Sequence, residues 1–287
     1  MAIYASQLSL SNPQKQSDEI LVLESIFGSE KFRHLDADEQ QYEICVEFDL
    51  PSAFTVQLHS SSISSPIKYL PPLTLTVQLH DQYPSDFSPT FALSCFYMSK
   101  RQLHELCQKL DAIFKESEVV IYQWTEIIKE DVCSKTELVL DSATKDDDQK
   151  YDDPRAISSH SSCPIGEIYQ QLLDYNRQKL ADEFQRSYHQ CLICTDDFPG
   201  SKFLCLLKCQ HYFCQQCLLD YARMHIQAGT VEQLTCPDST CNLSLLPTEV
   251  KEILTHDQDG EKLYEKYERL TLQKSLEHMT DIVWCPR

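Results

Sequence analysis

Long apolar runs are missing from this sequence, and short stretches such as VVIY and FLCLL are typical of it, so we expect no membrane span. The first residues also lack the charged and then apolar pattern of a signal peptide, so we expect an intracellular protein of the cytoplasm, the nucleus or both. Basic residues are few, with 25 Lys and Arg against 44 Asp and Glu. Because such a chain repels phosphate, we expect neither nucleic acid nor a membrane as a partner.

Cysteine, in contrast, is abundant, with 14 copies in 287 residues. Thiols stay reduced in the intracellular compartment that we expect, so this number favours metal binding over a disulfide scaffold. The chain is also long enough for two or more domains, and its 42% hydrophobic content can supply their cores.

The first half of the chain changes its hydrophobic period twice. Residues 17–27 predict a short helix with Ser17 as the N-cap and Gly28 at its end. Strict alternation then predicts strands, and helical spacing returns after a possible Ser99–Gln102 capping box. The expected strands lie at 42–50, 54–58, 73–79 and, more weakly, 90–96, and a further helix follows near 120–131. Strands in sequence followed by helices indicate an α+β fold with an antiparallel meander flanked by helices.

This first half resembles an RWD domain. The resemblance is carried by DEILVLESIFG at 18–28, by YPSDFSPTF at 83–91 and by the closing helices with Trp124. RWD domains are related to ubiquitin-conjugating enzymes but serve as protein-docking modules, so the resemblance implies a protein partner. Cys95 or Cys107 could instead be a conjugating nucleophile, but each lies in an apolar pattern, which favours a small buried side chain.

Periodicity is lost in the middle of the chain. Residues 135–165 are rich in Asp and Ser, and 141–153 hold six Asp against two Lys. We expect an acidic, flexible linker there, followed by a helix over 166–190.

Eight cysteine and histidine residues then follow at metal-ligand spacing. They are Cys191, Cys194, Cys209, His211, Cys214, Cys217, Cys236 and Cys241. Zn²⁺ takes four sulfur or nitrogen ligands in a tetrahedron, so eight ligands predict two zinc ions. A Cys–His nucleophilic pair is disfavoured, because a thiolate that holds zinc is occupied. Cys205 is left over and is expected to be packed, and His189 and His225 are expected at the surface.

The order of these ligands resembles a RING finger more than a PHD or LIM finger. That resemblance implies a cross-brace, in which Cys191, Cys194, Cys214 and Cys217 hold one zinc and Cys209, His211, Cys236 and Cys241 hold the other. It also implies an exposed apolar groove for a ubiquitin-conjugating enzyme, formed by Ile193, Leu218, Tyr221 and Pro237. Asn242 stands where many single RING ligases carry a basic residue.

The segment TCPDSTC at 235–241, with the helical stretches LPTEVKEIL and EKLYEKYERL after it, resembles the first RING of RBR (RING–in-between-RING–RING) ubiquitin ligases. In that family the first RING recruits the conjugating enzyme, and ubiquitin then passes through a thioester on a cysteine of the second RING to a substrate lysine. Cys285 matches the first ligand of the in-between-RING domain. We therefore expect the chain to be the N-terminal part of a longer transferase, with no catalytic residue of its own.

Two other functions remain open. One is a non-catalytic adaptor that docks partners through the RWD domain and a conjugating enzyme through the RING. The other is a zinc-dependent nucleic-acid binder, which the charge of 191–241 disfavours, with three Lys or Arg against five Asp or Glu. In the helix near 261–279, Leu263, Tyr267 and Leu270 favour packing on the finger over a family-type contact with ubiquitin.

The resulting domain prediction has seven parts. They are a tail at 1–16, an RWD domain at 17–134, the linker at 135–165, a helix at 166–190, a RING finger at 191–245, a helical linker at 246–284 and the start of an in-between-RING domain at 285–287.

Overall fold

The structure is a computed structural model that describes residues 11–36, 38–58, 63–140, 151–159, 163–255 and 257–277. It divides into two compact units, Met1–Leu180 and Ala181–Arg287, each of which has its own hydrophobic core. Within the described ranges, none of the helices is both long and apolar enough to span a membrane.

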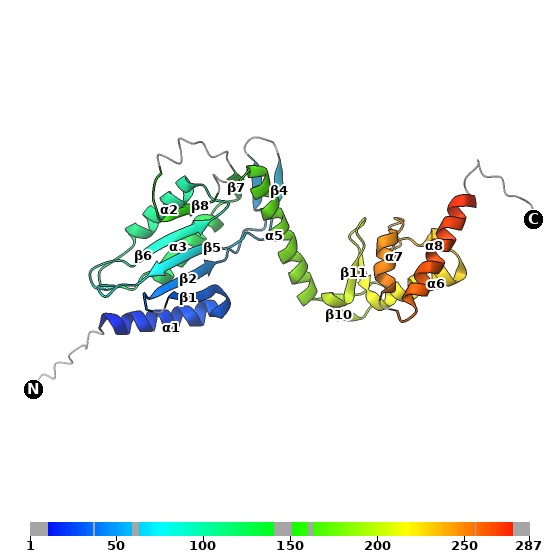
Figure 1. Ribbon diagram of the computed structural model, residues 1–287, viewed down its shortest axis with the longest axis horizontal. Helices are drawn as coiled ribbons and strands as arrows, with labels where there is room; N and C mark the ends of the chain where they lie inside the picture. The colour runs from blue at the N-terminus through cyan, green and yellow to red at the C-terminus, as the bar shows by residue number, and fades with distance from the viewer. Residues whose placement is uncertain are drawn as a thin grey trace, which may run out of the picture. The chain divides into compact units, whose positions relative to one another are not determined.

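The first unit opens with helix α1, Asn12–Lys31, which lies along strands β1 and β2 (Figure 1). The helix begins earlier than the expected residue 17, because Pro13 occupies the first turn, where a missing N–H costs nothing. Gly28 has a φ of 68°, so the regular helix breaks there as the sequence predicts.

A five-stranded sheet forms the centre of this unit, in the order β1-β2-β5-β6-β8. Its members are β1 (Phe32–Asp36), β2 (Gln41–Val46), β5 (Leu73–Gln78), β6 (Thr90–Cys95) and β8 (Ala156–Ser158). The first four pair antiparallel, as the meander predicts, but the strand expected at 54–58 is not among them and lies in a second sheet. The alternating side chains Ile44, Leu75 and Leu93 are fully buried.

A second, three-stranded sheet has the order β4-β3-β7 and consists of β4 (Ser64–Pro66), β3 (Thr55–Leu58) and β7 (Glu137–Leu140). Strands β7 and β8 lie inside the expected linker, so that expectation is wrong at both positions. Each pairs parallel with a strand far back in the sequence, β7 with β3 and β8 with β6. The burial of Leu138, Leu140 and Ala156 explains why these short segments are ordered. Residues 141–150 lie outside the described residues.

Helices α2 (Lys100–Ala112) and α3 (Ile121–Cys133) pack against each other and against the sheet. The capping box is present as predicted, since the Gln102 N–H donates to Ser99 Oγ at 3.3 Å and the Ser99 N–H donates to Gln102 Oε1 at 2.9 Å. Trp124 is fully buried, and its Nε1–H donates to the Leu110 carbonyl at 3.0 Å.

Cys95 and Cys107 are part of this core, which confirms that they are small buried side chains. Burial raises the pKa of the Cys95 thiol to about 11 and that of Cys107 to about 12. Both thiols therefore stay protonated at neutral pH, which is the opposite of what a nucleophile needs.

Helix α5, Ile165–Arg186, begins in the first unit, where Ile168, Tyr169 and Leu172 join the core, and ends in the second. The second unit then contains two small hairpins, β9–β10 (Tyr188–Gln190, Asp197–Pro199) and β11–β12 (Phe203–Cys205, Tyr212–Cys214). A short 3₁₀ turn, η2 (Gly200–Lys202), joins the two hairpins, and a second, η3 (Val231–Gln233), lies further along the chain.

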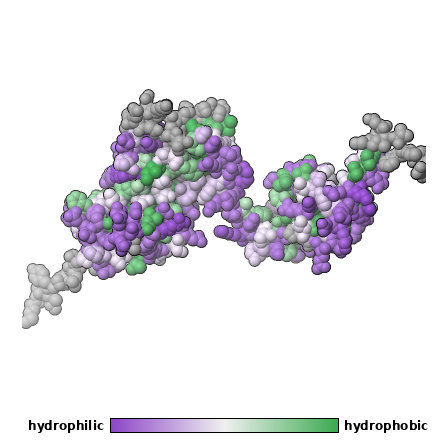
Figure 2. Space-filling view, viewed as in Figure 1, coloured by the Kyte–Doolittle hydropathy of each residue, from purple (hydrophilic) through white to green (hydrophobic). Residues whose placement is uncertain are grey.

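Three helices complete the second unit, namely α6 (Gln215–Ala228), α7 (Pro247–Leu254) and α8 (Gly260–Glu277). They pack against one another through residues that include Ile226, Ile253 and Tyr267, so the packing role expected for Tyr267 is confirmed. On the face seen in Figure 2, hydrophobic surface forms small patches within mostly hydrophilic surroundings on each unit.

Candidate metal centre

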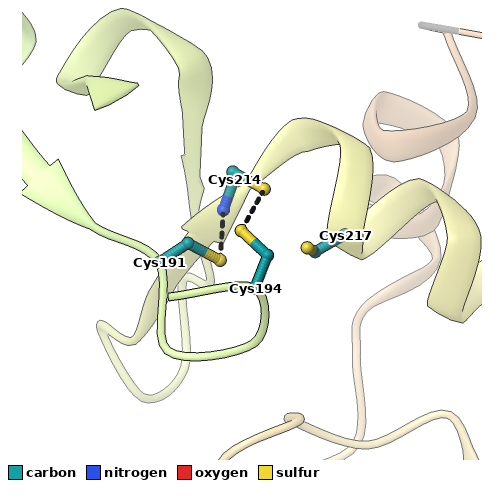
Figure 3. Close-up of side chains that lie close together, drawn as sticks. All are labelled: Cys191, Cys194, Cys214 and Cys217. Carbon is teal, nitrogen blue, oxygen red and sulfur yellow. Dashed lines mark hydrogen bonds between the residues drawn. The ribbon is translucent and has the colours of Figure 1, made fainter. Parts of the chain in front are cut away.

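The first ligand cluster joins a loop to the start of a helix. Cys191 and Cys194 lie in the loop between β9 and β10, Cys214 ends β12, and Cys217 lies in the first turn of α6. Their sulfur atoms point toward one another (Figure 3) and all lie within 4.8 Å of one another. The turn closes when the Thr195 N–H donates to the Cys191 carbonyl at 2.8 Å, and Thr195 has a φ of 65°.

The backbone of this cluster is arranged to stabilise negative charge on sulfur. The Cys214 N–H donates to Cys191 Sγ at 3.4 Å. Burial opposes ionisation of Cys191, but hydrogen bonds from backbone N–H groups outweigh it and lower the pKa of this thiol to about 7. For Cys217, burial and the neighbouring sulfur atoms raise the pKa far above its usual value. A cation is what would allow all four thiols to ionise together.

The second cluster is built from the β11–β12 turn and the loop that precedes α7. It contains Cys209, His211, Cys236 and Cys241, whose ligand atoms also lie within 4.8 Å of one another. Gln210 has a φ of 61°, and its N–H donates to the Leu206 carbonyl at 2.8 Å, which repeats the turn seen at Thr195.

His211 is oriented between a sulfur and a carboxylate. Its Nδ1 lies 3.3 Å from Cys236 Sγ, and its Nε2 lies 3.8 Å from Asp238 Oδ2. Metal-binding histidines commonly direct their second nitrogen to a carboxylate in this way. Burial and then the neighbouring thiols raise the pKa of Cys236 to about 12, so this cluster too favours a bound cation.

The two clusters interleave along the chain, and their membership is the one that the cross-brace predicts. Each cluster offers four donors, and seven of the eight donors in the two clusters are thiols. This donor set suits Zn²⁺. The residues present therefore fit two zinc ions.

Three residues outside the clusters lie in environments that differ from the expected ones. Cys205 is exposed rather than packed, because it lies at the end of the β11–β12 hairpin. His189 is half-buried rather than at the surface, since it stacks on Phe184 with ring centroids 4.0 Å apart. His225 is also half-buried, with Nδ1 2.9 Å from Thr230 Oγ1. Cys285 lies outside the described residues.

The four residues expected to form the conjugating-enzyme groove do not share one environment. Ile193 is 43% exposed, and Tyr221 and Pro237 are half-buried. Leu218 is fully buried, so its expected place on the surface is wrong. Leu218, Ala222 and Ile226 follow one another at helical spacing on the buried side of α6, and that spacing is the signal that could have identified it. Leu192, which the sequence analysis did not single out, is 65% exposed beside Ile193.

Comparison with known proteins assigns the first unit to a family. Residues 14–132 match the family model described as "RWD domain". The chain carries an RWD domain. The match covers α1, the meander and helices α2 and α3, as the sequence resemblance predicts, and ends before β7.

Relatives extend the similarity beyond the RWD domain to 98% of the chain. E3 ubiquitin-protein ligase RNF14 of Mus musculus is 32% identical over 98% of this chain and 64% of its own length. The Homo sapiens protein of the same name is 30% identical over 98% of this chain and 66% of its own length. E3 ubiquitin-protein ligase itt1 of Schizosaccharomyces pombe is 24% identical over 98% of this chain and 61% of its own length. The chain thus spans just under two thirds of these relatives.

Proposed function

We propose that this chain is the recruiting portion of an RBR-class ubiquitin-protein ligase. The two interleaved four-ligand clusters carry the proposal, because this is the pairing that the RING resemblance implies. The similarity to proteins named E3 ubiquitin-protein ligases supports it independently.

In this proposal Cys191, Cys194, Cys214 and Cys217 hold one Zn²⁺, and Cys209, His211, Cys236 and Cys241 hold the second. Zinc supplies no chemistry to ubiquitin transfer here. Its role is to balance the clustered thiolates and to hold the loops that carry the docking residues.

The conjugating enzyme docks on the exposed side of the finger, on Ile193 with Tyr221 and Pro237. Leu218 supports this surface from within and does not contact the partner, since its side chain is buried. Because Ile193 lies between Cys191 and Cys194, the metal cluster sets the position of the docking side chain.

Ubiquitin transfer then takes place in two acyl exchanges. A cysteine of the second RING attacks the thioester of the charged conjugating enzyme, so one C–S bond forms as the other breaks. A substrate lysine attacks the new thioester, and the cysteine is released as a thiol. Following the RBR resemblance, we propose that the accepting cysteine lies in the second RING. In this chain Cys95 and Cys107 are buried, and seven other cysteines belong to the two proposed zinc sites.

The first test is a binding measurement between the chain and a panel of uncharged ubiquitin-conjugating enzymes. We expect saturable binding to at least one enzyme, weakened about tenfold by Ile193→Ala in keeping with a hot-spot residue. Leu272→Ala, at a 61% exposed position on α8, is the control and should leave binding unchanged. Equal affinity for both variants would contradict the proposed docking surface.

The second test separates a transferase from an adaptor. The native full-length protein is mixed with activating enzyme, the conjugating enzyme that binds and ubiquitin, and resolved without reductant. We expect the native protein, but not the chain 1–287, to form a ubiquitin adduct that a thiol reductant removes. A native protein that binds the conjugating enzyme and never forms an adduct would be an adaptor.

A further inference from the structure

A groove on the RWD domain belongs to the first unit, whereas the metal clusters belong to the second, and it has no role in the function proposed above. It encloses about 740 Å³ between one face of α1 and the start of α3. Lys15, Asp18, Val22 and Ile26 line it from α1, at spacings of three and four residues, and Tyr122 lines it from α3.

The walls of this groove expose four large apolar side chains to solvent. Val22 is 54% exposed, Ile26 51%, Tyr122 43% and Val119 40%. Large apolar side chains that cluster in one open groove mark an interaction site, whereas isolated ones do not.

The floor of the groove is rigid. Glu19 is buried there, accepts a hydrogen bond from Tyr83 Oη at 2.6 Å and accepts another from the Ile121 N–H at 2.9 Å. These bonds join α1 to the start of α3, so the spacing of the two walls is fixed before a ligand arrives. Such preorganisation lowers the entropy cost of binding.

The rim of the groove is acidic. Asp18 and Glu118 line it with exposed carboxylates. The one basic residue of the lining, Lys15, donates to the Ser117 carbonyl at 3.2 Å. The rim is therefore complementary to a positively charged partner.

We propose that this groove binds a short amphipathic helix of a partner protein, with apolar residues on one face and Lys or Arg at its flanks. The lining of α1 from Lys15 to Ile26 spans roughly 16 Å at ~1.5 Å per residue, which matches about three turns of a bound helix. Two helices that form an apolar trough are a common receptor for a third. The inference adds the location and the chemistry of the partner to the protein-docking role that the RWD resemblance implies.

The test is a selection of random 16-residue peptides displayed on phage against the zinc-loaded chain. We expect the enriched peptides to carry apolar residues at helical spacing with Lys or Arg on their flanks. Synthetic copies should bind the chain saturably, and Ile26→Asp or Tyr122→Ala should each weaken binding at least tenfold. Leu35→Asp, at an equally exposed site on β1 outside the groove, is the matched control and should leave binding unchanged.

A charge exchange sharpens the selection. With Asp18→Lys and Glu118→Lys together, the enriched peptides should change from basic to acidic flanks, because the rim changes sign while the apolar walls remain. Enrichment of acidic peptides by the unaltered chain would overturn the proposal, as would binding that survives Ile26→Asp. Self-association of the chain that Ile26→Asp abolishes would also overturn it, because a second copy would then be the occupant.

The groove and the finger are tested separately on the same samples. Each groove variant should bind the conjugating enzyme as the unaltered chain does, since Ile193 is unchanged. Loss of peptide selectivity with intact enzyme binding would remove only the groove inference, whereas loss of enzyme binding in the unaltered chain would remove only the proposed recruiting function.

Discussion

The RWD unit and the finger unit obtain their cores in different ways. In the first, a sheet and two helices bury large apolar side chains such as Leu75, Leu93 and Trp124. In the second, three members of the candidate metal clusters, Cys191, Cys214 and Cys236, are themselves buried among the apolar residues. Four clustered donors need a cation if their thiols are to ionise together, whereas the separate thiols Cys95 and Cys107 of the first core stay protonated and need none.

Zinc removal should produce the largest difference between the units. Structural zinc contributes roughly 10–16 kcal/mol in small metal-dependent domains, so chelation should unfold α6 and the hairpins and leave the RWD domain intact. Hydrogen exchange followed by mass spectrometry would show lost protection over 191–241 and retained protection over α2 and α3. If α6 keeps its protection when all metal is chelated, its apolar contacts are enough to keep the helix folded without zinc.

Removal of a large core side chain should reverse this pattern. Trp124→Ala should lower the free energy of unfolding of the first unit by roughly 3–5 kcal/mol, because it leaves a cavity and an unpaired Leu110 carbonyl. The zinc content, measured by native mass spectrometry, should stay at two ions per chain. Leu21→Ala, at a 60% exposed site of α1, is the control and should change stability little. Loss of zinc from the Trp124 variant would show that the units depend on each other.

The buried polar network of the first unit should have an intermediate effect. Tyr83 Oη donates to Glu19 and accepts from the Val120 N–H at 2.8 Å. Tyr83→Phe leaves both groups without that partner, so we expect a loss of roughly 1–3 kcal/mol in urea unfolding. Tyr188→Phe, at a 74% exposed position, should cost nothing. Equal stability of the two variants would mean that the network is not a determinant of the fold.

An acid titration should give the smallest effect. Hydrogen bonds from the Arg155 side chain lower the pKa of Asp153 from 3.8 to about 2. The stabilisation is complete above the unfolded pKa and is lost as pH falls from about 4 toward about 2, and solvent screening should keep it below about 1 kcal/mol. Asp153→Asn should flatten this part of the pH profile, measured by Trp124 fluorescence with Trp284 replaced by Phe. A profile that the substitution leaves unchanged would contradict the lowered pKa.

The strongly periodic elements and the pairs of metal ligands could be predicted from the sequence. The Ser99–Gln102 capping box, the break at Gly28 and the alternation of β2 and β5 are local signals, and the structure contains all three. The metal-ligand pairs could be read in the same way, because short loops force neighbouring cysteines onto one cluster.

Elements that depend on contacts with residues far away in the sequence could not be predicted. Strands β7 and β8 are short and flank a stretch rich in Asp and Ser, and each pairs with a parallel neighbour far back in the chain. The family resemblance predicts Leu218 at the surface, because it gives the position of this residue in the helix and not the hydrophobic core that buries it.

The anchoring of β8 has a consequence for how the two units would cooperate. Arg155 binds both carboxylate oxygens of Asp111, at 2.7 and 2.9 Å, and its guanidinium lies 4.7 Å from the Phe91 ring centroid. The acidic stretch between β7 and β8 therefore starts and ends on the same unit and adds nothing to the tether between units. The connection between the units is therefore much shorter than the 31 residues of 135–165 suggest. A shorter connection would raise the effective concentration, near the second unit, of a protein that is bound to the RWD domain.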